Sequence, residues 1–223
     1  MARKHRILSS YAPHHITGRS NNREDFPLPL EIMWSILCHY LFIINRGYSI
    51  EIFSFVLMPN HFHLICRDPN RNLPDAMEYF MRESSRQVGR ISGRINKIWG
   101  GPYHNSLIDN ALYFFHAYKY VYRNPIEASL CNKAEDYPFS SLSILLGQRH
   151  SIIPISEDKI LFDDSPEKAL EWINASYKNV ERESIKKALR KSEFRLRKDP
   201  QNRKPLPLEN WDSVPFSRDD YEK

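Results

Sequence analysis

The sequence predicts an α+β fold with a ferredoxin-like core, in which strands and helices follow the order β-α-β-β-α-β and form an antiparallel sheet. Two long segments carry apolar residues at three-to-four spacing, which indicates helices. Short runs rich in β-branched and aromatic residues lie around them and indicate strands. The dipeptide Pro59-Asn60 separates two of these runs and predicts a hairpin turn.

The first half of the core is predicted as a strand, a helix and a hairpin. Residues 14–20 form the first strand and run into a polar turn. Residues 30–46 have the helical spacing, and we expect Gly47 to close that helix. Residues 49–58 and 61–67 are the two strands of the hairpin.

The second half of the core ends in an additional helix. Residues 73–91 return to helical spacing, and residues 99–108 predict the last strand. Asn110 is a good N-cap for a helix that begins at Ala111, and Pro125 must end or kink that helix.

The length of 223 residues is enough for one sizeable core with an appendage. We expect one main domain over residues 1–147 and a basic, mainly helical C-terminal extension over residues 148–223. Near their junction, residues 136–141 predict a loop and a short helix. Within the extension, residues 166–197 predict one helix.

Composition excludes several classes of protein. No stretch approaches the roughly 20 consecutive apolar residues that span a bilayer, and the N-terminal segment lacks the apolar block of a signal peptide. We therefore expect no membrane association and a cytoplasmic location. The cysteines, Cys38, Cys66 and Cys131, are far apart without CxxC spacing, which favours buried free thiols over disulfides or a zinc ribbon.

Positive charge is concentrated in the extension. The net charge is +5, which fits a polyanionic partner but is too small to establish one. Residues 178–204 hold eleven Lys and Arg against four Asp and Glu, an excess of seven, so the rest of the chain is slightly acidic. A basic helix there could hold a nucleic acid or fold back over a site, or it could be an ordinary solvated helix.

Two histidines on one strand form the first candidate site. Alternate side chains of a strand share a face, so His61 and His63 point the same way and Phe62 points to the other side. Two imidazoles on one face can bind one metal ion. Histidines on a strand are, however, more often surface or hydrogen-bonded residues without a ligand, so this pair needs a partner.

The helix after Asn110 supplies that partner. Tyr120 and Asn124 are four residues apart and share one helix face, while Tyr118 and Tyr122 share a neighbouring face. A single tyrosine on such an aromatic helix is usually a core residue. The tyrosine-asparagine spacing together with the histidine pair favours a catalytic interpretation.

Three motifs in this order resemble the REP-associated tyrosine transposases, which belong to the single-tyrosine HUH transposases. The motifs are HITGRSNNR at residues 15–23, MPNHFHL at residues 58–64 and YVYRNP at residues 120–125. The resemblance covers roughly residues 13–147, including DYPFSS at residues 136–141. Ser20 departs from it, because the family usually has glycine there and the local turn could differ.

The resemblance implies the residues and the chemistry of a site. His61 and His63 match the metal-binding pair, Tyr120 the nucleophile, and Asn124 a third ligand where related transposases use glutamine. The family joins its tyrosine to the 5′ phosphate of single-stranded DNA and releases a 3′ hydroxyl. By resemblance we expect a nucleoid-associated monomer or homodimer that acts as an endonuclease and strand transferase on hairpin-flanked repetitive DNA.

The residue types suit this chemistry by themselves. Attack on a phosphodiester builds negative charge on nonbridging oxygens, which a divalent cation stabilises. Two neutral imidazoles and one amide oxygen leave open coordination positions, which favours Mg²⁺ or Mn²⁺ over zinc. A phosphotyrosine preserves the energy of the broken bond, so joining can follow cutting without ATP.

Arginines are the candidate DNA contacts. Arg19 and Arg23 follow the first strand. A second set recurs every four residues and predicts a basic stripe on one helix flank, unless Gly89 and Gly93 break the helix, and consists of Arg82, Arg86, Arg90 and Arg94. A solvated helix face explains this stripe equally well.

Other functions remain open at this point. A catalytically silent protein that binds structured nucleic acid is one alternative, and the intact set of site residues argues against it. A rolling-circle initiator or relaxase is another, which the short chain and single tyrosine disfavour. A metallohydrolase with an activated water is a third, and a covalent DNA adduct would exclude it.

Overall fold

The computed structural model describes residues 7–156 and 165–216. Four antiparallel strands form one sheet in the order β2-β3-β1-β4. The core elements are β1 (His14–Arg19), α1 (Leu30–Tyr48), β2 (Glu51–Met58), β3 (His61–Arg67), α2 (Leu73–Ser92) and β4 (His104–Leu107). The predicted ferredoxin-like order is therefore confirmed.

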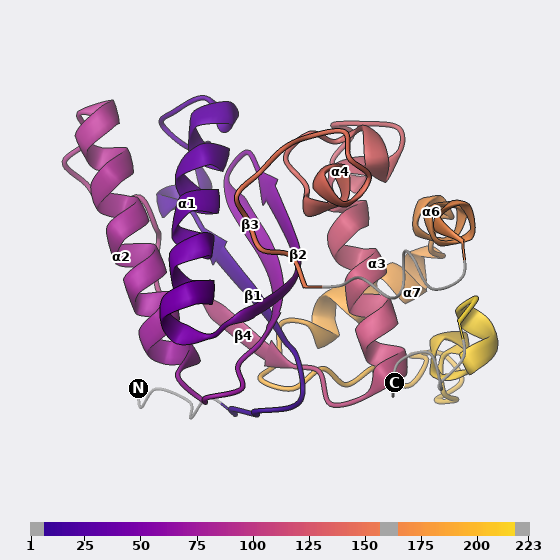
Figure 1. Cartoon of the computed structure of the whole chain (residues 1–223). Coiled ribbons are helices and arrows are strands. Elements are labelled where there is room, and N and C mark those ends of the chain that lie inside the picture. The colour runs from indigo at the N-terminus through magenta and orange to yellow at the C-terminus, as the bar shows by residue number, and fades with distance from the viewer. Residues whose placement is uncertain (1–6, 157–164, 217–223) are drawn as a thin grey trace.

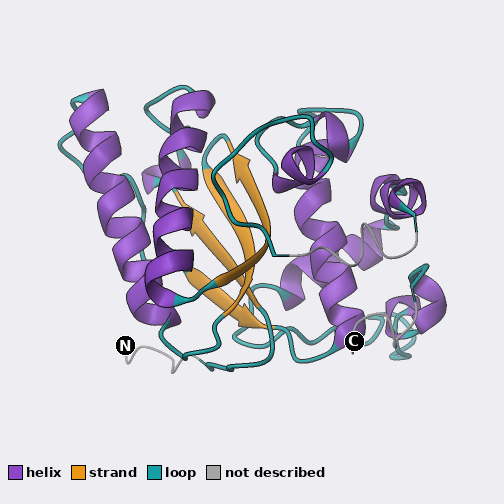
Figure 2. Cartoon of the chain, viewed as in Figure 1, coloured by secondary structure: helices purple, strands orange, loops and turns teal. Residues whose placement is uncertain are grey.

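The two faces of the sheet are covered by different helices. Helices α1 and α2 cover one face, and α3 (Ala111–Glu127) covers the other (Figures 1 and 2). Strand alternation divides the side chains accordingly. On β3, Phe62 and Leu64 join the core under α1 and α2, whereas Ile65 joins the core under α3.

Phe62, the residue between the two histidines, requires a glycine on the neighbouring strand. Gly18 on β1 pairs in register with Phe62 on β3. A Cβ atom at Gly18 would lie 2.4 Å from the Phe62 ring, so only glycine leaves room for it. This contact places the phenyl ring under α1 and α2 and turns His61 and His63 towards α3.

Several predicted element boundaries differ from the structure, most by one or two residues. Helix α1 ends two residues beyond residue 46, and Ser49, in the left-handed conformation with φ 58°, caps it instead of Gly47. The last strand is confined to His104–Leu107, because Gly100, Gly101 and Pro102 form a turn and only Trp99 bridges to Ser20. Asn110 caps α3 as predicted, but Pro125 is inside its last turn.

The extension contains two helices instead of the single one predicted for residues 166–197. Helix α6 (Pro166–Asn174) ends at Ala175, which is extended, and α7 (Asn179–Ala188) begins after Lys178. The break allows Tyr177 to pack against α3, which periodicity alone does not reveal. A short helix, α4 (Ser141–Leu145), and four 3-10 turns complete the described structure, at Asn21–Arg23, Ala134–Asp136, Pro207–Glu209 and Trp211–Ser213.

Other parts of the chain cover both outer strands of the sheet. Ser156 N donates to Ile52 O of β2 over 2.8 Å. At the opposite edge, Leu107 N of β4 donates to Ser192 O over 3.0 Å, and Phe194 N donates to Leu107 O over 2.8 Å. Among the described residues no helix is long and apolar enough to cross a membrane.

Candidate active site

A cavity of about 370 Å³ lies between the α3-facing side of the sheet, α3 and α7. His61 and His63 line it from β3, and Tyr120 and Asn124 line it from α3. The four residues that the sequence predicted as a site are thus brought together, although β3 and α3 are separated by more than forty residues of chain. Helix α7 contributes basic side chains to the same cavity.

Asn60 determines which nitrogen of His61 carries the proton. The Asn60 Nδ2 group donates to Arg23 O over 2.9 Å, so its Oδ1 atom is the acceptor. That Oδ1 lies 2.7 Å from His61 Nδ1, which must therefore donate. In neutral His61 the Nε2 atom then keeps its lone pair, which is the form that binds a metal ion.

His63 is held by another histidine, His15 of β1. The His15 Nε2 and His63 Nδ1 atoms lie 2.9 Å apart, and the two rings are stacked with centroids 5.2 Å apart. Only one proton can occupy that contact. The other nitrogens, His63 Nε2 and His15 Nδ1, are buried and have no hydrogen-bond partner among the described residues. If His63 donates, its Nε2 lone pair is available to a cation.

Burial keeps these imidazoles neutral. Desolvation lowers the pKa of His61 to about 4 and that of His15 to about 3. It lowers the pKa of His63 well below the ordinary value, and the nearby His61, His15 and Arg19 lower it further. Neutral rings at physiological pH are the form that metal binding requires.

Only one tyrosine of the three at the end of α3 lines the cavity. Tyr118 and Tyr122 are each 1% exposed and belong to the core, where their ring centroids are 4.7 Å apart. The Tyr122 hydroxyl lies 2.9 Å from Ser141 Oγ. Tyr120 instead lies edge-on to His63, with ring centroids 5.8 Å apart.

The Tyr120 hydroxyl is a weak nucleophile without assistance. Burial raises its pKa above the ordinary value, while the charges of Arg190, Arg182 and Arg19 act in the opposite direction. The phenol is therefore protonated at neutral pH. A further positive charge close to its oxygen would favour the phenolate.

Asn124 lines the cavity from α3. Its Nδ2 group donates to Tyr120 O over 2.8 Å, one helical turn back. That contact uses the nitrogen of the amide and leaves Oδ1 as the free atom, which is the atom that can bind a cation. No group of three or more His, Cys, Asp or Glu side chains suited to a metal occurs in the described structure. A metal here would instead use two imidazoles and this amide.

The turn after β1 places Arg19 beside the histidines. Arg19 pairs in register with His61 and lines the cavity, whereas Arg23 is exposed in the following turn. Ser20 adopts φ −58°, so its side chain causes no backbone strain where the resembling family has glycine. Ser20 N donates to Asn60 O over 2.8 Å and joins this turn to the hairpin turn.

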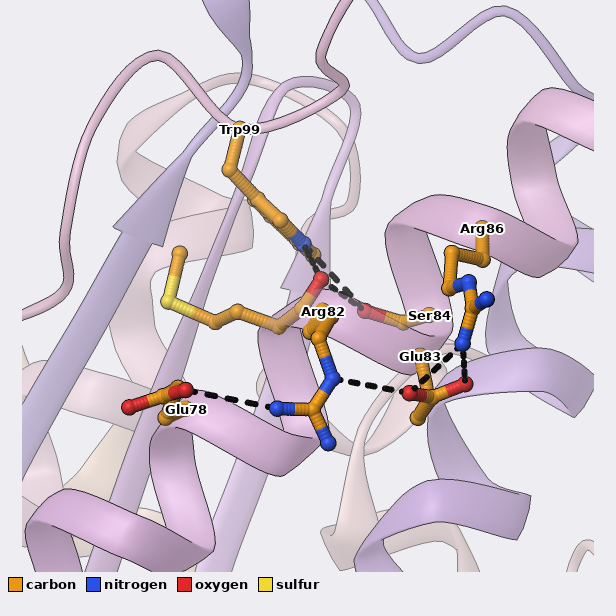
Figure 3. Close-up of polar contacts among 7 residues, drawn as sticks. Glu78, Arg82, Glu83, Ser84, Arg86 and Trp99 are labelled. Atoms are coloured by element: carbon orange, nitrogen blue, oxygen red, sulfur yellow. Dashed lines mark hydrogen bonds and ion pairs between the residues drawn. The ribbon is translucent and has the colours of Figure 1, made fainter.

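The predicted arginine stripe lies away from the cavity. Gly89 does not interrupt α2, and Gly93 caps it, so three of the arginines lie in the helix and Arg94 follows it. Helix α2 covers the sheet face opposite α3 (Figure 1). Figure 3 shows Arg82 between Glu78 and Glu83, at 3.3 and 2.9 Å, and Arg86 against Glu83 at 3.3 Å. Binding of DNA by this stripe stays a prediction.

Several residues of the cavity were not predicted from the sequence. His15 shares its face of β1 with Thr17 and Arg19, so strand alternation was the available signal. The excess of positive charge over residues 178–204 left open whether the extension folds back over a site, and the structure places three of its cations against the cavity. They are Arg182, Lys186 and Arg190.

Comparison with known proteins finds similarity in sequence and in fold. No family model matches the chain. The REP-associated tyrosine transposase of Escherichia coli (strain K12) is 26% identical over 139 residues, which are 60% of this chain and 82% of that protein. A solved structure of a REP-associated tyrosine transposase bound to a REP hairpin has the same fold, with a TM-score of 0.55, 21% identity, and coverage of 70% of this chain and 93% of that one. The chain is thus a relative of the REP-associated tyrosine transposases.

Proposed function

We propose that this protein is a metal-dependent endonuclease and strand transferase of single-stranded DNA that uses Tyr120 as its nucleophile. One observation carries the proposal. Of three tyrosines within five residues of α3, only Tyr120 leaves the core and lines the cavity that also contains His61, His63 and Asn124. A purely structural aromatic helix gives no reason for that arrangement.

The chemical step is a transesterification. The Tyr120 oxygen attacks phosphorus and loses its proton, and a bond from tyrosine to the 5′ phosphate forms. The bond from phosphorus to the 3′ oxygen breaks, and that oxygen takes up a proton as a 3′ hydroxyl. Attack by a 3′ hydroxyl on the phosphotyrosine reverses the step and joins strands without ATP. Arg19 lies where it can hold the phosphate while this occurs.

The donor set suits Mg²⁺ or Mn²⁺. His61 Nε2, His63 Nε2 and Asn124 Oδ1 would hold the ion, because each is the free atom of a side chain whose other polar atom is already engaged. Such an ion would stabilise the charge that develops on the phosphate oxygens. Asn60 and His15 would keep the two imidazoles oriented with their lone pairs towards it.

The relationship suggests the substrate. The similar solved structure contains a REP hairpin, and the motifs HITGRSNNR, MPNHFHL and YVYRNP of this sequence resemble those of the family. We therefore propose hairpin-flanked single strands as the DNA of this protein, which would act as a monomer or homodimer at the nucleoid.

Replacement of single tyrosine hydroxyls tests the proposal. Tyr120→Phe removes one oxygen and keeps the ring, so we expect covalent adduct and nicked product to disappear while stability changes little. Tyr118→Phe and Tyr122→Phe are matched controls that should keep activity. Tyr122→Phe should still cost about 1 kcal/mol of stability, because it removes the hydroxyl that contacts Ser141.

The assay is incubation with labelled hairpin-bearing single strands and Mn²⁺, followed by denaturing gel analysis and peptide mapping. Addition of a chelator should abolish the adduct. DNA attached to Tyr118 or Tyr122 would assign the nucleophile to a different residue. Nicking by Tyr120→Phe without an adduct would mean that water attacks, and binding without any nicking would indicate a silent nucleic-acid-binding protein.

A further inference from the structure

We propose that the C-terminal extension supplies the second wall of the DNA groove, in which Lys186 and Arg190 bind backbone phosphates next to the scissile one. The inference rests on the proposed function of the cavity. It concerns a segment outside the predicted transposase-like domain, and it assigns that segment a direct contact with the substrate.

The extension forms one side of the cavity. Arg182 and Lys186 lie four residues apart on one face of α7, and Arg190 follows in the turn two residues after the helix ends. All three line the cavity that contains Tyr120. Arg19 lines it from β1, on the sheet side. A strand that enters the cavity would therefore meet cations on two sides of the tyrosine.

The charges in the cavity are unbalanced. The cations that line it are Arg19, Arg123, Arg182, Lys186 and Arg190, and the only carboxylate among the lining residues is Glu127. Glu127 is already bound to Arg123 at 2.8 Å and to Arg182 at 3.1 Å. Phosphate is the charged group of a DNA strand, and it would neutralise the remaining excess.

Lys186 and Arg190 are the cations that are available to a ligand. Among the described residues, Lys186 forms an ion pair only with Glu183, at 3.4 Å, and such a pair at the surface is weak. Arg190 has no carboxylate within 4.0 Å among the residues of the described ranges. Its charge reaches the site, because it is among the charges that lower the pKa of Tyr120.

The backbone that carries these cations is fixed to the core. His104 Nε2 donates to Arg190 O over 2.8 Å, and residues 192–194 pair with the edge strand β4. Ile185, Leu189 and Phe194 are buried in the core of α3. Lys186 and Arg190 are therefore held next to the cavity before DNA binds, which reduces the entropy lost on binding.

Salt-dependent binding in a Tyr120→Phe background tests the inference without cleavage. The probe is a labelled oligothymidine of about 16 nucleotides, which reports contacts to phosphate and not to sequence. We expect Lys186→Ala/Arg190→Ala to reduce the slope of log K against log salt by about 1.4, because each phosphate contact of a single strand contributes about 0.7. At 0.1 M salt this corresponds to roughly 25-fold weaker binding.

Lys187→Ala/Lys198→Ala is the matched control. It removes the same charge from exposed positions of the extension that do not line the cavity, so its slope should stay close to that of the parent. Equal losses in the two double variants would overturn the inference, because net charge alone would then explain binding. Absence of a loss in Lys186→Ala/Arg190→Ala, or absence of oligothymidine binding by the parent, would also overturn it.

A second DNA probe, a hairpin-bearing single strand in which the hairpin fixes the register, isolates the contact further. Neutral methylphosphonate linkages, introduced one at a time, should weaken binding of the parent at one or two positions and have no effect there in Lys186→Ala/Arg190→Ala. Additive losses at every position would contradict direct contact. If this pattern holds while the protein with Tyr120 intact forms no adduct with hairpin-bearing strands, the proposed function fails and the contact of Lys186 and Arg190 with phosphate is still supported.

Discussion

Asn60, in the hairpin turn between β2 and β3, orients His61 of the site. Its amide oxygen fixes the proton of His61 on Nδ1, and its amide nitrogen holds the turn after β1 through Arg23 O. Groups that orient metal ligands in this way usually contribute 10- to 100-fold to metal affinity or activity.

We therefore expect Asn60→Ala to raise the Mn²⁺ concentration needed for half-maximal adduct formation by about 10- to 100-fold. Asn60→Asp is the control, because a carboxylate still accepts from His61 Nδ1 while the contact to Arg23 O is lost. If Asn60→Asp needs no more Mn²⁺ than the parent, the effect of Asn60→Ala comes from the lost contact to His61. Equal impairment of both variants would attribute it to the turn instead.

At the scale of single residues, the sequence could predict the four site positions but not their partners. Two periodicities placed His61 with His63 and Tyr120 with Asn124. Nothing local indicated that His15 would contact His63, because that contact depends on the register of β1 against β3. The choice of Tyr120 over Tyr118 and Tyr122 came from the family resemblance, with the spacing to Asn124 in support, and the burial of the other two agrees with it.

Helix α2 and helix α7 carry similar ladders of basic residues, yet only α7 faces the cavity. Sequence spacing could predict a stripe on α2 but not which face of the sheet that helix covers. It also could not show that Arg94 pairs with Glu24 at 3.2 Å, across 70 residues of chain. Arg90 has no ion pair among the described residues, so it is the most available cation of the α2 stripe.

For Arg86→Ala/Arg90→Ala we expect a decrease in the salt slope of no more than about 0.7, the contribution of one phosphate contact. Glu83 partly neutralises Arg86, so Arg86 should contribute little to the salt slope of DNA binding. The rate of adduct formation at saturating DNA should not change, because α2 covers the other face of the sheet. An unchanged affinity and slope would show that the stripe is a solvated surface, and a slower adduct rate would contradict its separation from the site.

At the scale of the whole molecule, the C-terminal extension packs into the same core as α3. Side chains of the extension, among them Ala169, Trp172 and Phe194, share one apolar cluster with α3. Arg123 of α3 donates to Ile173 O over 3.1 Å and also binds the carbonyl of Asn174. Removal of the extension would therefore expose the buried side of α3, the helix that carries Tyr120. Composition and charge could not predict this packing.

Lys119 is the buried charge at this junction. It is 5% exposed and lies over the rings of Trp172 and Tyr177, at 5.1 and 4.6 Å from their centroids. The pKa of Lys119 is lowered to about 8, chiefly by desolvation and also by the charge of Arg123, while Glu181 acts in the opposite direction. Its charged form is thus less favourable in the folded state than in the unfolded chain.

The sign of the resulting pH dependence follows from proton binding. Between pH 8 and the unfolded value of about 10.5 the unfolded chain binds more protons at this residue, so stability should rise with pH in that window. The slope cannot exceed about 1.36 kcal/mol per pH unit for one group. The measurement should stop near pH 9.5, because burial raises the pKa of Tyr113 to about 12, and such tyrosines lower the stability once unfolded tyrosines ionise.

The check is denaturant unfolding of the parent and of Lys119→Met at roughly pH 7.5, 8.5 and 9.5. This series begins just below the window and covers its lower part. Methionine keeps the apolar stem and removes the charge, so the stability of the parent should rise relative to Lys119→Met as pH increases. The exposed Lys187→Met on α7 is the control, and its curve should run parallel to that of the parent. Parallel curves for Lys119→Met as well would mean that Lys119 keeps its proton in the folded state, with the rings of Trp172 and Tyr177 compensating for its burial.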